Sequence, residues 1–186
     1  MKGFFTYEII GIDIGKNKHF FCVMDQQTGE IISQPVSFSN DKDAHNNYGP
    51  FTPGFLRIPY NDIEALAKVL EDEAEHIAAF LVEPIQGEAG VYVPDEGYLK
   101  NASELCKKYN VLFVADEVQT GIARTGKLIA CHHENVQPDI LILGKALSGG
   151  MYPVSAVLAN DNIMQVIHPG QHGSTFGGNP LACAVA

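Results

Sequence analysis

Beyond residue 54 the sequence alternates between short apolar runs and longer amphipathic segments. The apolar runs lie at residues 78–84, 111–118, 139–144 and 153–159, and the amphipathic segments at 61–73 and 98–110. Strands that alternate with helices along a chain form βαβ units around a mainly parallel sheet. The pattern therefore predicts an α/β fold. We expect Asn61 to cap the first helix, and shorter helices at 160–167 and 180–186.

The first 40 residues follow a different pattern. Strand-like segments occupy 8–15, 19–25 and 30–38, with the turn QQTG between the second and third. These segments predict a three-stranded β-meander. Residues 41–54 are polar and rich in Asn, Asp, Gly and Pro, as in a linker. The sequence thus divides into an N-terminal β segment (1–40), a linker (41–54) and an α/β domain (55–186).

Composition limits the classes of protein that fit. The chain has 186 residues, of which 46% are hydrophobic, and this is enough for a compact domain. Its formal net charge of −10 argues against a surface built to bind nucleic-acid phosphates. No apolar run approaches the ~18 residues of a membrane-spanning helix, and the first residues show no signal-peptide pattern. These features predict a cytoplasmic protein.

The cysteines and histidines do not predict a metal site. The four cysteines form no CxxC pair, which favours reduced thiols over a disulfide framework. Cys131, His132 and His133 are consecutive, but side chains of adjacent residues rarely converge on one ion. We therefore expect no metal.

Polar side chains follow three of the predicted strands. They are Glu83, Gln86 and Glu88 after the first, Asp116, Glu117 and Gln119 after the second, and Lys145 and Ser148 after the third. Ligands of open α/β sheets bind at the carboxyl ends of the strands. We therefore expect a site where these groups meet.

Lys145 has three interpretations. A Walker lysine would need GxxxxGK followed by Ser or Thr, but Asp139 replaces the first glycine and Ala146 follows the lysine. A surface lysine would point into water, which is common at strand ends. A covalent catalyst would be a desolvated amine that condenses with a carbonyl. The apolar or small flanks LILG and ALSGG, and the acid Asp116 on a neighbouring strand, favour the covalent role.

Pyridoxal phosphate (PLP) is the cofactor that matches this combination. It needs a lysine and a carboxylate that keeps its ring nitrogen protonated, and Asp116 is the candidate carboxylate. Asp116 and Glu117 are consecutive on a strand, so their side chains point to opposite faces, and we expect Glu117 to be a solvated or capped strand-end acid. Ser174 and Thr175 precede a predicted helix in a glycine-rich segment and are candidates for binding the cofactor phosphate.

Five motifs carry a resemblance to a known family. They are NYGPFTPGF, VEPIQGEAGV, LFVADEVQTGIARTGK, PDILILGKALSGGMYPVSAVLA and HGSTFGGNPLA. Together they make residues 46–186 resemble class III PLP-dependent aminotransferases, whose large domain has PLP-transferase fold type I. Within that family, GGMYPVSAV and HGSTFGGNP resemble the ornithine aminotransferases more than the acetylornithine or GABA enzymes. Those remain the alternatives.

The resemblance implies a role for each site residue. Lys145 would form the Schiff base and move the substrate proton, and Asp116 would pair with the pyridinium nitrogen. Gln119 would hydrogen-bond the phenolic oxygen of the ring. Thr175 would reach the phosphate of a neighbouring subunit's cofactor, which implies a homodimer. Glu88 would pair with a substrate-binding arginine and gate it.

The implied reaction moves the δ-amino group of ornithine to 2-oxoglutarate. It yields glutamate and glutamate semialdehyde, which leads toward proline. The sequence ends at Ala186 within an apolar run, and we expect a truncated domain with little or no activity by itself.

The N-terminal segment resembles a second family. IGIDIGKNKHFFCVMDQQTGEIISQPVSFSN is similar to the start of an IS110-type transposase, which has an RNase H-like fold. There, the acid at Asp13 would be one of several metal-binding carboxylates that act on DNA. Metal catalysis needs several carboxylates brought together, so we expect no chemistry from Asp13 here. The two resemblances meet near residues 40–46 and suggest a fusion. A transposase-derived nucleic-acid-binding fragment is the alternative function.

Overall fold

The computed structural model describes residues 7–9, 13–15, 18–20, 23–25 and 54–186. The chain divides into two compact units. One comprises Met1–Leu56 with Asp161–Gly177, and the other comprises Arg57–Asn160 with Gly178–Ala186. The expected junction near residues 40–46 lies outside the described residues, so the fusion remains a prediction.

Four short strands belong to the first unit. They are β1 (Tyr7–Ile9), β2 (Asp13–Gly15), β3 (Lys18–Phe20) and β4 (Val23–Asp25). β2 pairs with β3 and β1 pairs with β4, both antiparallel. The predicted strands 8–15 and 19–25 thus pair with each other, each as two shorter strands. The third predicted strand, 30–38, lies outside the described residues. Helix α4 (Asp161–Met164) also belongs to this unit.

The second unit is built on a four-stranded sheet in the order β5-β6-β7-β8. The strands are β5 (Ala79–Val82), β6 (Leu112–Asp116), β7 (Ile140–Leu143) and β8 (Ala156–Ala159). β5, β6 and β7 are parallel, and β8 is antiparallel to β7. The four apolar runs therefore form strands as predicted, in an α/β fold whose sheet is mixed.

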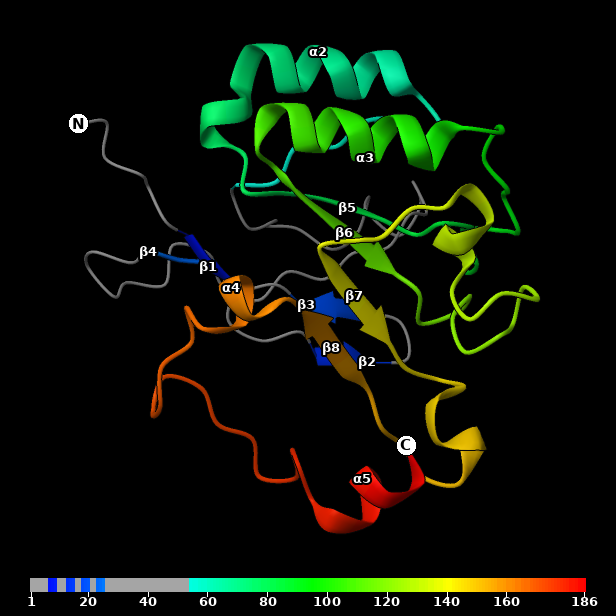
Figure 1. The fold of residues 1–186 in the computed structure, drawn as a ribbon, viewed down its shortest axis with the longest axis vertical. Helices are drawn as coiled ribbons and strands as arrows, with labels where there is room; N and C mark the ends of the chain where they lie inside the picture. The colour runs from blue at the N-terminus through cyan, green and yellow to red at the C-terminus, as the bar shows by residue number, and fades with distance from the viewer. Residues whose placement is uncertain (1–6, 10–12, 16–17, 21–22, 26–53) are drawn as a thin grey trace, which may run out of the picture. The chain divides into compact units, whose positions relative to one another are not determined.

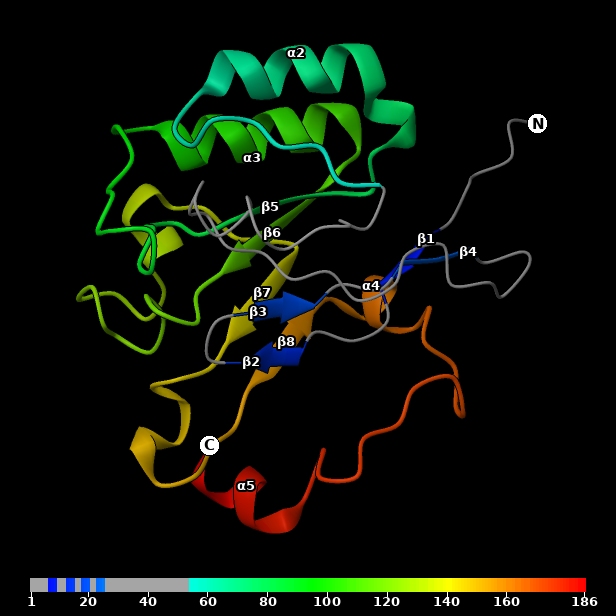
Figure 2. The same ribbon diagram turned by 180° about the vertical axis from the view of Figure 1, so that it is seen from behind.

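Two helices pack side by side on this unit, α2 (Ile63–Glu73) and α3 (Tyr98–Tyr109) (Figures 1 and 2). Their buried residues form one apolar cluster with residues of β6. The cluster includes Leu66, Leu70, Leu99, Ala102, Cys106, Phe113 and Ala115. Removal of this apolar surface from water is the main force that holds the helices on the sheet.

The cap of α2 differs from the prediction. Asp62, and not Asn61, is the N-cap, since its Oδ1 accepts a hydrogen bond from the Ala65 N–H at 2.8 Å. Asn61 has a φ of 63° and exchanges two hydrogen bonds of 2.9 Å with Asp95. Asn and Asp are both good cap residues. The long-range bonds to Asp95 therefore decide which of the two becomes the cap.

The connection from β6 to β7 also differs from a simple βαβ unit. Within residues 117–139 the described helical element is a 3-10 helix, η2 (Ala130–Glu134). Ile122 and Ala123 have φ values of 55° and 64°, which no α-helix accommodates. The carboxyl end of β6 is therefore followed by a long irregular loop.

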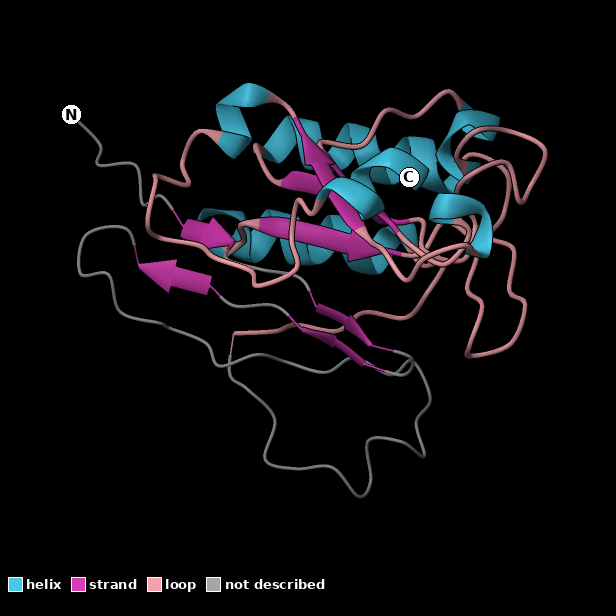
Figure 3. Cartoon of the chain, turned by 90° about the horizontal axis from the view of Figure 1, so that it is seen from below, coloured by secondary structure: helices cyan, strands magenta, loops and turns pink. Residues whose placement is uncertain are grey.

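Three further short helices complete the second unit. They are η1 (Ala74–His76), η3 (Leu147–Gly150) and α5 (Pro180–Val185). Figure 3 distinguishes helices from strands by colour. Among the residues that the structure describes, no helix has the length and apolar character needed to cross a membrane.

Candidate active site

Lys145 lies at a strained turn directly after β7. Its φ is 40°, in the left-handed region that non-glycine residues seldom adopt. The preceding Gly144 is closely packed, because a Cβ there would lie 3.3 Å from a methyl carbon of Val118. Strained backbone of this kind costs about 1–3 kcal/mol and is concentrated at functional sites. The turn fixes where the lysine leaves the sheet.

Three predicted site residues meet at one carboxylate oxygen. Glu88 Oε1 lies 3.2 Å from Lys145 Nζ and 2.6 Å from Gln119 Nε2. These two donors hold the pKa of Glu88 below its ordinary range, with the lysine as the larger cause. The Lys145 and Glu88 side chains are 45% and 70% exposed, so solvent screens the ion pair. The structure thus brings together residues 31 and 57 positions apart.

The loop that carries Glu88 is held by its own hydrogen bonds. Glu83 Oε2 accepts the Gly87 N–H at 3.0 Å, and Gln86 and Tyr92 form an antiparallel bridge. Tyr60 donates its hydroxyl to the carbonyls of Glu83 and Pro84 at 3.2 and 3.0 Å. Burial raises the pKa of the Tyr60 phenol, so the hydroxyl remains a donor. These bonds give Glu88 a defined position beside β6 and β7.

Asp116 ends β6 next to β7, and its Cα pairs with Ile142. Its side chain is 6% exposed, and Oδ1 accepts the Val118 N–H at 3.0 Å. The register places Asp116 and Lys145 at the carboxyl ends of two neighbouring parallel strands. The carboxylate and the amine are therefore at the same edge of the sheet, as predicted. The Lys145 side chain, however, is exposed and paired with Glu88, and is not the desolvated amine that the sequence predicted.

Glu117 has a structural role that was predicted only in part. The Glu117 N–H bonds the Ile142 carbonyl, so strand alternation continues and its side chain opposes that of Asp116. The carboxylate is 1% exposed and accepts the Thr120 hydroxyl and the Ala130 and Cys131 N–H groups, the last two at 2.9 and 2.8 Å. The solvated alternative is therefore wrong, and the carboxylate is satisfied by donors, two of which are the first N–H groups of η2.

The charge of Glu117 also affects its surroundings. Burial raises the pKa of the Cys131 thiol, and the nearby Glu117 carboxylate raises it further. Cys131 is therefore an inert, protonated core thiol. The sequence signal for this arrangement was the position of Glu117 next to Asp116 on a strand, which separates the two side chains. It did not reveal the partners of Glu117.

Two of the three hydroxyl residues, Ser148 and Ser174, have local hydrogen-bond partners. The Ser148 hydroxyl donates to the Tyr152 carbonyl at 2.6 Å and accepts its N–H at 3.1 Å. Ser174 Oγ accepts the Gly177 N–H at 2.9 Å, and Thr175 is exposed. Ser174 and Thr175 belong to the first unit, whereas Lys145 belongs to the second. Their phosphate-binding role remains a prediction.

Asp13, the acid of the transposase-like segment, opens β2. Within the described part of the chain, no group of three or more His, Cys, Asp or Glu side chains is arranged to hold a metal ion.

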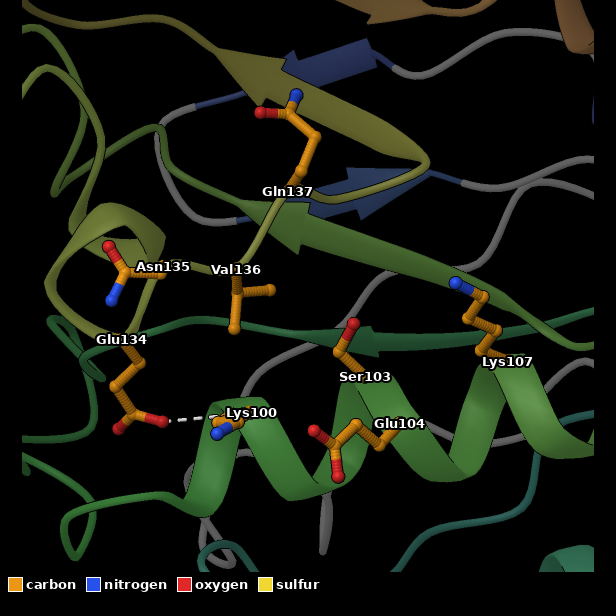
Figure 4. Close-up of a pocket in the computed structure, with 8 residues that line it drawn as sticks. All are labelled: Lys100, Ser103, Glu104, Lys107, Glu134, Asn135, Val136 and Gln137. Atoms are coloured by element: carbon orange, nitrogen blue, oxygen red, sulfur yellow. Dashed lines mark hydrogen bonds between the residues drawn. The ribbon is translucent and has the colours of Figure 1, made fainter.

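A pocket of about 250 Å³ lies elsewhere on the second unit (Figure 4). It is lined by Lys100, Ser103, Glu104, Lys107, Glu134, Asn135, Val136 and Gln137. Glu134 is already engaged, because its carboxylate accepts the Lys100 N–H at 2.9 Å in the first turn of α3. None of the predicted site residues lines this pocket, so the candidate site is the open strand edge at Lys145.

Comparison with known proteins assigns the family. Residues 29–186 match the family model of class III aminotransferases. The chain therefore belongs to the class III aminotransferase family, whose members are PLP-dependent transaminases. The match begins inside the segment that resembles transposases. That second resemblance remains a prediction.

Within the family, the chain is similar to ornithine aminotransferases. It is 63% identical over 150 residues to the ornithine aminotransferase of Plasmodium falciparum, covering 81% of this chain and 36% of that protein. It is 59% identical to the Toxoplasma gondii ornithine aminotransferase, with a TM-score of 0.74 over 79% of this chain and 34% of that one. That structure has partial occupancy of PLP at its active site.

A third relative has a different description. The chain is 83% identical to an acetylornithine aminotransferase from Elizabethkingia anophelis, with a TM-score of 0.71 over 80% of this chain and 36% of that one. The chain thus spans 34–36% of the length of these three relatives. Their fold supports the predicted PLP-transferase architecture for the second unit.

Proposed function

We propose that this chain carries the cofactor-binding lysine of an ornithine aminotransferase. In that reaction the δ-amino group of ornithine passes to 2-oxoglutarate and gives glutamate and glutamate semialdehyde. The observation that carries the proposal is the placement of Lys145 and buried Asp116 at the ends of neighbouring parallel strands. Similarity to the Plasmodium and Toxoplasma enzymes supports ornithine as the amino donor.

The residues present fit a PLP group. When bound, PLP supplies an aldehyde for an amine and a protonated ring that withdraws electrons. Lys145 is the proposed amine, since its side chain is partly exposed and leaves the sheet at a strained turn. Asp116 is the proposed partner of the ring nitrogen, because its buried charge is little screened by solvent. Lys145 would thus hold the aldehyde carbon of the group, and Asp116 would keep its ring nitrogen protonated.

The other residues have supporting roles in the proposal. Gln119 would donate a hydrogen bond to the phenolic oxygen, and its amide already lies beside Lys145 through their shared contact with Glu88. Lys145 would also take and return the proton at the substrate carbon. Ser174 and Thr175 would bind phosphate, with Thr175 acting across a homodimer. Glu88 would gate a substrate-binding arginine.

Acetylornithine is the second candidate donor. The Elizabethkingia protein, at 83% identity, is described as an acetylornithine aminotransferase. The two donors differ in an acetyl group on the α-nitrogen, which removes a positive charge. Half-transamination with each donor, followed by the change in cofactor absorbance, distinguishes them. Whatever conversion the chain supports should be faster with ornithine, and faster conversion with acetylornithine would reverse the assignment.

Covalent trapping tests the cofactor role without turnover. Purified chain is incubated with PLP, reduced with borohydride and mapped by peptide mass spectrometry. We expect the adduct mainly on Lys145, its loss in Lys145→Arg, and weaker labelling in Asp116→Asn. Equal labelling of Lys145 and the exposed Lys68 would overturn the proposal. Glutamate formation under the same conditions tests the further expectation that this chain alone has little or no activity.

A further inference from the structure

We propose that Glu88 and Gln119 form a latch on Lys145 that the lysine must leave before it can react with an aldehyde. The proposal deepens the proposed function, since it rests on Lys145 being the reactive amine. In this latch, the Glu88 carboxylate binds the amine and the Gln119 amide holds the carboxylate. Glu88 and Gln119 are thus positioning residues for the cofactor-free chain.

In the latch, two side-chain donors share one acceptor atom. Lys145 Nζ and Gln119 Nε2 both donate to Glu88 Oε1, at 3.2 and 2.6 Å. The two donors come from segments that follow β7 and β6, whereas Glu88 comes from the loop after β5. Three consecutive strands of the sheet therefore contribute one group each. The lowered pKa of Glu88 agrees with two donors on one oxygen.

Gly87 determines where the Gln119 side chain lies. A Cβ on Gly87 would be 2.9 Å from Gln119 Cδ and 3.0 Å from Nε2, closer than real Cβ contacts allow. The Gln119 amide therefore rests against the bare Gly87 backbone, one residue before Glu88. A methyl group at Gly87 would move the amide away from the carboxylate.

The chemistry explains why the latch matters. An ammonium group bound to a carboxylate has no lone pair to donate. It must release a proton, after which the neutral nitrogen attacks the carbonyl carbon and one water leaves to give an imine. While Lys145 Nζ donates to Glu88 Oε1 it is held away from an incoming carbonyl carbon, so the latch slows the first contact with an aldehyde. Because both side chains are well exposed, we expect an effect of about two- to fivefold.

Reductive methylation measures the latch on the cofactor-free chain. Formaldehyde with cyanoborohydride labels each lysine, and peptide mapping gives the rate at Lys145 relative to the exposed Lys68. Glu88→Gln keeps the shape and removes the charge, and it should raise this ratio about two- to fivefold. Gly87→Ala should raise it by less. Glu96→Gln, an exposed acid before α3, is the matched control and should leave the ratio unchanged.

The dependence of the methylation ratio on salt concentration is an independent test of the latch. Screening weakens exposed ion pairs, so raising the salt from about 0.01 to 1 M should increase the Lys145 ratio in the natural chain and not in Glu88→Gln. An unchanged ratio in Glu88→Gln, or an equal salt effect in both proteins, would overturn the latch. If PLP labels Lys145 but Glu88→Gln leaves the methylation ratio unchanged, the latch alone is rejected. If Glu88→Gln raises the methylation ratio but PLP does not label Lys145, the cofactor role is rejected.

Discussion

Two carboxylates near the candidate site behave in opposite ways. Glu117 is 1% exposed and accepts hydrogen bonds from two backbone N–H groups and one hydroxyl. Glu88 is exposed and accepts from two flexible side chains. A buried charge without donors is costly, so Glu117 must keep its bonds. Glu88 can exchange partners at little cost, as a gating or latching residue requires.

Replacement of Glu117 tests the structural role. Glu117→Gln retains the size but loses the charge that accepts three donors, and one end of the amide presents N–H groups to N–H groups. We expect a loss of about 1.5–3 kcal/mol in the free energy of unfolding, measured by urea denaturation. Glu96→Gln, on the surface, should change it by less than about 0.5 kcal/mol. Equal stabilities of the two variants would contradict the assigned role.

At the scale of elements, the loops after β5, β6 and β7 build the site, and the strands position the loops. Each loop is fixed by a different device. Tyr60 and Glu83 hold the first, Glu117 holds the second, and the positive φ of Lys145 shapes the third. Convergence of the three loops depends on the parallel order of β5, β6 and β7. An antiparallel neighbour would place its loop at the other end.

The start of α2 gives a prediction at this scale. Asp62→Ala removes the acceptor for the Ala65 N–H and should destabilise the chain by about 1 kcal/mol. Asp62→Asn keeps a capping oxygen and should retain most of the stability. Urea denaturation followed by circular dichroism measures both variants. If the alanine and asparagine variants were equally destabilised, the cap would not be the cause.

At the scale of the whole molecule, the second unit has the one extensive core in the described part of the chain. Helices α2 and α3 cover the sheet face that carries Phe113 and Ala115. The candidate site lies on the loops at the edge of this sheet, outside the apolar cluster. The residues that stabilise the fold therefore differ from those proposed for the chemistry. A substitution in the core should lower the stability without changing which lysine reacts.

Truncation of Leu70 tests this separation. Leu70 is 1% exposed, and Leu70→Ala should lower the free energy of unfolding by about 2–5 kcal/mol. Leu128→Ala, at a residue that is 63% exposed, should cost less than about 0.5 kcal/mol. In chains that remain folded, Lys145 should still be the residue labelled by PLP. A shift of the label to another lysine would contradict the assignment.

Local patterns predicted most elements of the second unit. The apolar runs became β5, β6, β7 and β8, and the amphipathic segments became α2 and α3, because burial of apolar faces dominates both choices. Local patterns did not predict the N-cap of α2, where a long-range hydrogen bond decides between two residues that cap helices equally well. Asn61 and Asp62 are similar caps by type, and the distant Asp95 separates them. The irregular β6–β7 connection likewise depends on contacts made by Glu117 after folding.

Periodicity and motifs along the chain were enough to predict the family, the α/β alternation and the residue types at the strand ends. Which of those groups meet depends on how the strands and helices pack. Packing brings Gln119 and Lys145 to one oxygen of Glu88, and it buries Glu117. Contacts between residues 31 and 57 positions apart depend on strand order and loop geometry, which only the packing of the sheet and its helices fixes.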